Sequence, residues 1–290
     1  MSAAPRAGVL GLGLIGSRVA ARLQSAGIPL AVWNRTPRDF DGLPALSADP
    51  AAVAREADIL QIFVADDEAL RSTIRAMLPA VRPGHILISH ATVAPQTVRE
   101  LAAEVSAAGA VFLDAPFTGS RDAAAQGQIT YYVSGDSGAL KRARPILEIS
   151  AKTILPMGEV GDASAVTLAT NIMAAAAAVS LAEAIQLLHT NNVDPEVLVA
   201  ALENNAARSG VVDLKLPCML RDEFAPRFSA RNMRKDLRLA RDHAAPTHCA
   251  LTKSMLDLYE QACAQGFADE DFAAVIKVAA TADTRPKSGH

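Results

Sequence analysis

The chain has 290 residues, which is enough to bury one large core or two ordinary ones. Half of the residues are hydrophobic, 20% are charged and 4% are aromatic, a composition that predicts a packed globular protein rather than a disordered one. The formal net charge of −3 leaves no basic surplus of the kind that nucleic-acid-binding proteins carry, so we expect no nucleic-acid partner.

The first predicted element is a strand, turn and helix in residues 8–23. A short apolar stretch is followed by Gly11, Gly13 and Gly16 in the spacing G-x-G-x-x-G, and then by an amphipathic helix. Gly11 permits the tight turn, Gly13 lets a pyrophosphate approach the backbone, and Gly16 lets the helix pack closely on the sheet. The helix N-terminus offers unpaired N–H groups to the phosphates. The pattern therefore predicts a dinucleotide site, and its alternative is a glycine turn that binds no nucleotide.

The residues after the second predicted strand indicate which cofactor binds. NAD-binding chains usually carry an acidic residue about 20 positions after the glycines, where it binds the ribose 2′-hydroxyl. Here the strand is followed by Asn34, Arg35, Thr36 and Arg38, and the first carboxylate is that of Asp39. Two arginines and a hydroxyl suit a 2′-phosphate, whereas an acid would repel it. We therefore predict NADPH, and the alternative is a solvated turn.

Strands and helices alternate through the first half of the chain. The expected strands are residues 8–10, 30–33, 58–64, 85–88 and 110–113, and the expected helices are 50–57, 68–78 and one that starts near Pro95. Later strands at 129–134 and 153–155 flank a helix near 139–148. This order predicts a Rossmann-type parallel sheet with ligands beyond the carboxyl ends of its strands. Acids at 66–68 are interpreted as helix caps rather than as a metal site.

The strand signal ends near residue 161. Residues 162–190 predict one long interdomain helix, followed by helices at 195–204, 214–221, 232–244, 251–264 and 268–280 and a frayed tail at 285–290. We therefore expect two domains: a Rossmann-type α/β domain at 1–160, and an all-α domain at 161–290 that begins with the long helix.

Other patterns concern the compartment and metals. The most apolar run, residues 172–182, is interpreted as too short and too weakly apolar to span a bilayer, and no targeting signal is expected. Three cysteines without C-x-x-C spacing are interpreted as reduced thiols, so we expect a cytoplasmic protein with no membrane partner. His243 and His248 have no third ligand nearby, so no metal is expected.

Several stretches together resemble the β-hydroxyacid dehydrogenase superfamily. They are the glycine turn 11–16, the turn 33–36, residues 92–95, 114–119 and 158–161 with Asn171, and the pair Lys235 and Asp236. The family includes 3-hydroxyisobutyrate dehydrogenases, glyoxylate and succinic semialdehyde reductases and, more distantly, imine reductases. The resemblance covers nearly the whole chain. It implies at least a homodimer in which a partner subunit can complete the cleft.

The resemblance and the strand ends together define the expected site. Cofactor contacts are expected from the glycine turn, the turn after the second strand and two residues toward the nicotinamide: Gly11, Leu12, Gly13, Leu14, Ile15, Gly16, Asn34, Arg35, Thr36, Arg38, Val64, Thr92 and Lys235. Substrate contacts are expected from Ala91, Thr118, Gly119 and Lys235, and the catalytic candidates are Thr167, Asn171 and His90.

The chain departs from this family at the residue that handles the proton. Family dehydrogenases carry a lysine four residues before the asparagine of the interdomain helix, and this lysine acts as the general acid toward a carbonyl. Here Thr167 stands four residues before Asn171, and a threonine hydroxyl is a poor proton reservoir near neutral pH. The loops that bind the substrate carboxylate in the family also change, because Ala91 replaces a serine and Thr118-Gly119-Ser120 replaces Ser-Gly-Gly.

These departures favour C=N reduction over C=O reduction. Reducing a ketone leaves an alkoxide that needs a proton, and losing the general acid costs about 10²–10⁴-fold. An iminium ion arrives protonated and needs only hydride, and imine reductases also lack the lysine. We therefore predict an NADPH-dependent imine or iminium reductase. Two alternatives stay open: a hydroxyacid dehydrogenase or semialdehyde or glyoxylate reductase that takes its proton from His90 or Lys235, and a non-catalytic NADP-binding scaffold like the family's nucleosome-associated member.

Overall fold

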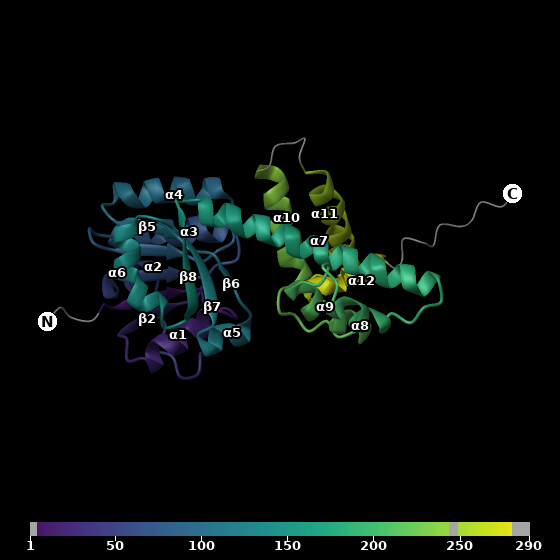
Figure 1. Ribbon diagram of the computed structural model, residues 1–290. Coiled ribbons are helices and arrows are strands. Elements are labelled where there is room, and N and C mark those ends of the chain that lie inside the picture. Colours follow the sequence, from purple (N-terminus) through teal and green to yellow (C-terminus); the bar gives the residue numbers. More distant parts are fainter. Residues whose placement is uncertain (1–4, 244–248, 280–290) are drawn as a thin grey trace. The chain divides into compact units, whose positions relative to one another are not determined.

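The computed structural model describes residues 5–243 and 249–279 (Figure 1). The contacts of the chain divide it into two compact units, which meet in sequence between Thr167 and Leu168. We call them the N-terminal unit and the helical unit, and each is described by itself. The predicted tail at 285–290, and the predicted helix ends at Ala244 and Ala280, lie outside the described residues.

The N-terminal unit is built on one sheet. Its strands are β1 (Ala7–Leu10), β2 (Leu30–Trp33), β3 (Ile59–Ile62), β4 (Ile86–Ser89), β5 (Val111–Asp114), β6 (Phe117–Thr118), β7 (Ile129–Gly135) and β8 (Ala151–Gly158). They lie in the order β2-β1-β3-β4-β5-β7-β6, and β8 also pairs with β7. Strands β1 to β5 are parallel, as predicted. Strand β7 runs antiparallel to β5 and β6.

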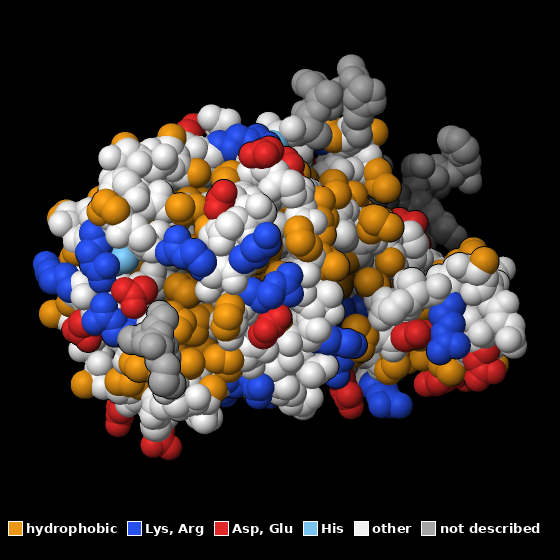
Figure 2. Space-filling view, turned by 60° about the vertical axis from the view of Figure 1, so that its left-hand side comes forward, with side chains coloured by type: hydrophobic (Ala, Val, Ile, Leu, Met, Phe, Trp, Pro, Cys, Tyr) orange, Lys and Arg blue, Asp and Glu red, His pale blue; other side chains and the backbone are white. Residues whose placement is uncertain are grey.

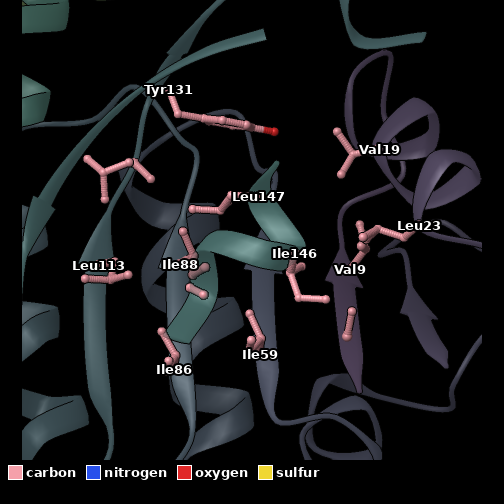
Figure 3. Close-up of a cluster of buried hydrophobic side chains, with 14 of the residues drawn as sticks. Val9, Val19, Leu23, Ile59, Ile86, Ile88, Leu113, Tyr131, Ile146 and Leu147 are labelled. Carbon is pink, nitrogen blue, oxygen red and sulfur yellow. The ribbon is translucent and has the colours of Figure 1, made fainter. Parts of the chain in front are cut away.

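Helices cover both faces of this sheet. They are α1 (Gly16–Ser25), α2 (Pro50–Glu56), α3 (Asp67–Met77), α4 (Pro95–Ala107), α5 (Arg121–Gln126) and α6 (Ser137–Leu147), with a 3₁₀ turn at Leu78–Ala80. Neighbouring residues of one strand enter different cores: Val9 packs with α1 and α6, whereas Leu10 packs with α2 and α3. Figure 3 shows the first of these cores, in which Ile146 and Leu147 of α6 lie over the strands. Burial on both faces explains why the parallel strands β1 to β5 are largely apolar.

The acids after β3 begin helix α3, as predicted. Asp66 is its N-cap and accepts a hydrogen bond from the backbone N–H of Ala69 at 2.8 Å. Asp67 accepts from the Thr97 hydroxyl and from the Ala94 N–H, so it ties α3 to the start of α4. Both carboxylates therefore serve helix capping and packing.

The helical unit contains most of α7 (Asp162–Thr190) and then α8 (Val197–Glu203), α9 (Gly210–Leu220), α10 (Ala230–His243), α11 (Ala250–Ala262) and α12 (Ile276–Ala279). Helix α9 begins earlier than predicted, because the Ser209 hydroxyl caps it by accepting from the Val212 N–H. The helix predicted at 268–280 is wrong at its start. Gly266 adopts a φ of 95°, and the chain re-enters a helical turn only at Phe272, where Asp271 is the cap.

Helix α7 spans the residues that the sequence predicted. By length and composition the whole helix could cross a membrane, since its most apolar window has a mean hydropathy of 1.7, whereas the prediction considered only the shorter run 172–182. One such helix is weak support for a membrane span, because a core helix has the same character. Six side chains of α7 lie in the core of the helical unit: Ala175, Ala178, Val179, Leu181, Ala182 and Ile185. This packing accounts for the apolar composition.

Candidate active site

The glycine turn lies at the carboxyl end of β1, beside the end of β3. Strand β1 pairs with β2 on one side and with β3 on the other, so the order of the sheet reverses at this point. In open parallel sheets such a switch point leaves a crevice in which ligands bind. The turn predicted from sequence therefore occupies the position where this fold class binds dinucleotides.

The three glycines have different reasons to be glycine. Gly11 has a φ of +93°, and a Cβ there would collide with the carbonyl oxygen of Phe63. A Cβ on Gly16 would collide with the carbonyl oxygen of Gly11. Gly13 has neither constraint, since open space surrounds the position where its Cβ would be. The fold requires Gly11 and Gly16 but not Gly13, whereas a pyrophosphate approaching the backbone does require Gly13.

The N-terminus of α1 is open to an anion. Its N-cap residue, Ile15, makes no side-chain cap, and its first turn carries no acid. The side chain of Leu14 is 65% exposed beside it, whereas Leu12 is buried. The N–H groups of this turn, with the positive end of the helix dipole, fit a phosphate.

The turn after β2 is organised around Asn34. Its Oδ1 accepts from the Leu12 N–H at 2.9 Å, and its Nδ2 donates to the Thr36 carbonyl at 2.8 Å. Arg38 donates to the Leu12 carbonyl at 3.2 Å, and its guanidinium lies 4.6 Å from the centre of the Phe40 ring. Asn34 and Arg38 therefore connect this turn to the glycine turn. Arg35 is exposed next to them, where its guanidinium can meet a 2′-phosphate.

Replacing Arg35 with glutamate is expected to raise the Kd for NADPH about a hundredfold, because a charge-assisted bond is worth roughly 1.5–3 kcal/mol and repulsion adds to its loss. The Kd for NADH should stay within about threefold, since NADH has no 2′-phosphate. Isothermal titration with each cofactor measures both constants. The control is Arg55→Glu, the same charge change at an exposed site where α2 ends. An equal loss of affinity for NADPH and NADH in Arg35→Glu would contradict the assignment of Arg35 to the 2′-phosphate.

The other strand ends carry the remaining predicted contacts of this unit. Val64 follows β3 and Thr92 follows β4, and both are half-buried. Thr118 and Gly119 are exposed at the end of β6. Ala91 is 1% exposed and packs in the core with α2 to α4. The predicted substrate contact at Ala91 is therefore a core position in the structure.

His90 is placed differently from what a proton donor needs. Its ring is 3% exposed, with Nδ1 2.7 Å from the Ala115 carbonyl oxygen and Nε2 3.0 Å from the Gln61 side chain. Burial lowers the pKa of His90 to about 3, so the ring is neutral at physiological pH. Because both nitrogens are occupied and the ring is enclosed, these surroundings do not suit the proton donor that the sequence suggested at His90.

Thr167 lies near the end of the N-terminal unit, on α7. It is 4% exposed, and its hydroxyl donates to the Ala163 carbonyl one turn earlier at 2.9 Å. A hydroxyl has a single proton to donate, and this one is directed at the helix backbone. This contact to the preceding turn is common for a helical threonine, and a threonine hydroxyl is a poor proton donor near neutral pH.

In the helical unit, Asn171 and Lys235 meet at one carboxylate. Asp236 is 1% exposed; its Oδ2 accepts from the Asn171 amide at 2.7 Å, and its Oδ1 lies 3.0 Å from the Lys235 ammonium. Burial raises the pKa of Asp236, and the charge of Lys235 acts in the opposite direction. Lys235 and Asp236 therefore form an ion pair, and the same carboxylate also holds Asn171.

Asp114 was noted in the sequence only as part of a family motif. The structure shows it buried at the end of β5, where it accepts from the Ser164 N–H and hydroxyl and from the Ser134 hydroxyl. Burial raises its pKa to about 6, and these hydrogen bonds act in the opposite direction. Asp114 therefore ties β5 and β7 to the first turn of α7.

The raised pKa of Asp114 predicts a stability that falls with pH. Between about pH 4 and 6 the native state holds a proton that the unfolded state has released, so the free energy of unfolding decreases as pH rises through this window. Relative to that of Asp114→Asn, the free energy of unfolding of the wild type should fall by about 2 kcal/mol between pH 4.5 and pH 7. Urea unfolding of both proteins at the two pH values measures this. A constant difference between them would show that Asp114 does not titrate in this window.

Most of the chain matches models of known families. Residues 6–158 match the NAD-binding domain of 6-phosphogluconate dehydrogenase, and residues 161–279 match the NAD-binding domain of NADP-dependent 3-hydroxyisobutyrate dehydrogenase. The chain is 31% identical to chloroplastic glyoxylate/succinic semialdehyde reductase 2 of Arabidopsis thaliana, over 96% of this chain and 80% of the relative.

Solved structures give the same result. The 3-hydroxyisobutyrate dehydrogenase of Mycobacterium tuberculosis, solved with L-serine, superposes with a TM-score of 0.88 at 28% identity, over 95% of this chain and 99% of that one. An imine reductase from Myxococcus stipitatus in complex with NADP⁺ superposes with a TM-score of 0.59 at 20% identity, over 95% and 100%, which shows a shared fold. The glycine turn at the sheet switch point, the two family models, the Arabidopsis relative and the Mycobacterium structure agree: the chain belongs to the β-hydroxyacid dehydrogenase superfamily of NAD(P)-dependent oxidoreductases.

Proposed function

We propose that this protein is an NADPH-dependent reductase that delivers hydride to the C=N bond of an iminium substrate. The observation that supports this most is the Thr167 hydroxyl, which donates to its own helix instead of standing as a proton donor. The turn containing Arg35 and Thr36 supports the choice of NADPH, because it lacks an acid and presents an exposed guanidinium.

The reaction suits the groups that are present. Reduced nicotinamide supplies a hydride when it is bound. An iminium substrate then needs no proton, because the electron pair of its C=N bond moves to nitrogen and neutralises the charge. The N–H groups at the start of α1 bind the pyrophosphate in this proposal, and Arg35 binds the 2′-phosphate. His90 stays neutral and takes no part in proton transfer.

One observation favours a second candidate, reduction of a C=O bond. Lys235 is a half-buried lysine that is held by Asp236 beside Asn171. An ammonium fixed in this way can donate a proton to a developing alkoxide. Small semialdehydes and glyoxylate, which the Arabidopsis relative is named for, are the substrates to test.

The test follows NADPH oxidation at 340 nm with two substrate panels. One contains cyclic imines such as 1-pyrroline and dihydroisoquinolines, and the other contains small semialdehydes and glyoxylate. Turnover of imines alone supports the proposal, and turnover of carbonyls alone contradicts it and points to Lys235. If both panels are silent while NADPH binds, the non-catalytic scaffold becomes the better account.

The proposal also covers assembly and compartment. We place the protein in the cytoplasm as a homodimer, in line with the family resemblance and with three cysteines, Cys218, Cys249 and Cys263, that form no disulfide in the described residues. Helix α7 exposes Met173 and Leu187, which are 72% and 64% accessible and suit contact with a second copy. The face shown in Figure 2 mixes basic and acidic side chains, which gives no support for a nucleic-acid partner. Light scattering after gel filtration tests the dimer, and a monomeric mass would contradict it.

A further inference from the structure

The buried ring of His90 connects the ends of three adjacent strands. It follows β4 directly, its Nδ1 lies 2.7 Å from the carbonyl oxygen of Ala115 after β5, and its Nε2 lies 3.0 Å from the side chain of Gln61 on β3. The pairing of β3 with β4 and of β4 with β5 brings these partners together. Such a bridge is unexpected for a loop histidine, and the proposed reaction does not use it.

The two partners define the protonation state of the ring. A carbonyl oxygen only accepts, so Nδ1 must carry the hydrogen. The neutral ring then has an acceptor at Nε2, which has to face a donor. Gln61 supplies that donor when its amide is turned so that the NH₂ group, which otherwise has no partner, points at Nε2. Gln61 therefore donates a hydrogen bond to His90, and His90 donates one to the Ala115 carbonyl.

The ring also supports the residue that packs under the glycine turn. It stacks on Phe63 with ring centres 4.3 Å apart and planes 18° apart, and the ring centre of Tyr131, which is labelled in Figure 3, lies 4.9 Å from that of His90. Phe63 in turn fits closely against the glycines: its carbonyl oxygen occupies the place of a Cβ on Gly11, and its own Cβ would be 3.1 Å from a Cβ on Gly16. A displacement of Phe63 would therefore move the glycine turn.

From this geometry we infer that His90 is a positioning residue for the nicotinamide cofactor, acting as a neutral clamp between Gln61, Ala115 and Phe63. It holds Phe63 under the glycine turn and fixes the chain on either side of the crevice, since Val64 follows Phe63 and Thr92 lies two residues beyond His90. The inference rests on the proposed placement of NADPH at these strand ends. It makes His90 important for cofactor affinity and irrelevant to proton transfer.

A matched pair of histidines tests the inference. His85 is also fully buried, but it lies at the amino end of the same strand, where its Nδ1 accepts from the Arg82 N–H. His90→Phe keeps an aromatic ring and loses both hydrogen bonds, and we expect the Kd for NADPH to rise about tenfold. His85→Phe should leave this Kd unchanged, even where it lowers the melting temperature. His90→Asn, whose amide can still donate to Ala115, should recover part of the affinity.

Two further readouts separate positioning from a structural or acid–base role. In wild-type protein, ¹⁵N-detected imidazole spectra should show His90 neutral with the hydrogen on Nδ1 throughout pH 5–8, and the pH profile of kcat/KM should keep its shape in His90→Phe. Titration of His90 in this range, or equal NADPH affinity of wild type and folded His90→Phe, would overturn the inference. If wild type itself fails to bind NADPH, the proposed function fails instead, and the spectra still report on the clamp.

Discussion

Replacing Gly13 with valine is expected to abolish NADPH binding while the fold stays intact. The position of a Cβ at residue 13 is surrounded by open space, so the N-terminal unit can accept a side chain there. The pyrophosphate cannot, because the branched side chain would occupy the surface that the phosphate oxygens must approach. We expect the Kd for NADPH to rise at least about a hundredfold, which corresponds to about 3 kcal/mol. Fluorescence titration gives the Kd, and thermal unfolding without cofactor checks the fold.

The other glycines supply the controls. Gly210, at the start of α9, is also surrounded by open space, so Gly210→Ala should change neither the fold nor the Kd. Gly11→Ala should instead destabilise the apo-protein, because its Cβ meets the Phe63 carbonyl and its φ of +93° disfavours alanine. Undiminished NADPH binding by Gly13→Val would show that the turn is not the pyrophosphate site.

Local patterns predicted the sheet well where both faces are covered. Largely apolar runs such as Ile59–Ile62 and Ile86–Ser89 are typical of buried parallel strands, and each lies where the sequence indicated. The two-residue strand β6 and helix α5 were missed, because they are too short for a periodic signal. The last predicted helix begins too early, because alanine-rich residues after Gly266 favour a helix while the turn at Asp271 interrupts it.

The part of the candidate site that depends on local backbone shape could be predicted from the sequence. The part that depends on packing between distant residues could not. The glycine spacing and the missing acid after β2 are local features, and they placed the proposed cofactor residues on adjacent strand ends. The environment of His90 is not local: its partner Gln61 is 29 residues away and Ala115 is 25 away. A sequence pattern shows that a histidine follows a strand, but only packing shows that its ring is enclosed. The same holds for Asp114, whose partner Ser164 is 50 residues distant.

Replacing Thr167 with lysine is expected to raise turnover of semialdehydes and glyoxylate by about 10²-fold or more, because a lysine at this position can act as the general acid that carbonyl reduction requires. Thr167 is 4% exposed, so burial should lower the pKa of a lysine there toward neutrality, where proton donation is effective. Steady-state NADPH oxidation with both substrate panels measures the change. Iminium turnover should fall, since a second positive charge would repel the substrate.

Two further variants at the same position distinguish the effect of an acidic hydrogen from the effect of side-chain size. Thr167→Met has the length of lysine without an acidic hydrogen and should gain no carbonyl activity. Thr167→Val keeps the volume of threonine and removes the hydroxyl; because that hydroxyl already donates to Ala163, iminium turnover should stay within about threefold. Loss of iminium turnover in a folded Thr167→Val that still binds NADPH would make the hydroxyl a proton donor and contradict the proposal. Carbonyl activity that is unchanged by lysine and lost in Lys235→Met would instead assign the proton to the ammonium held by Asp236.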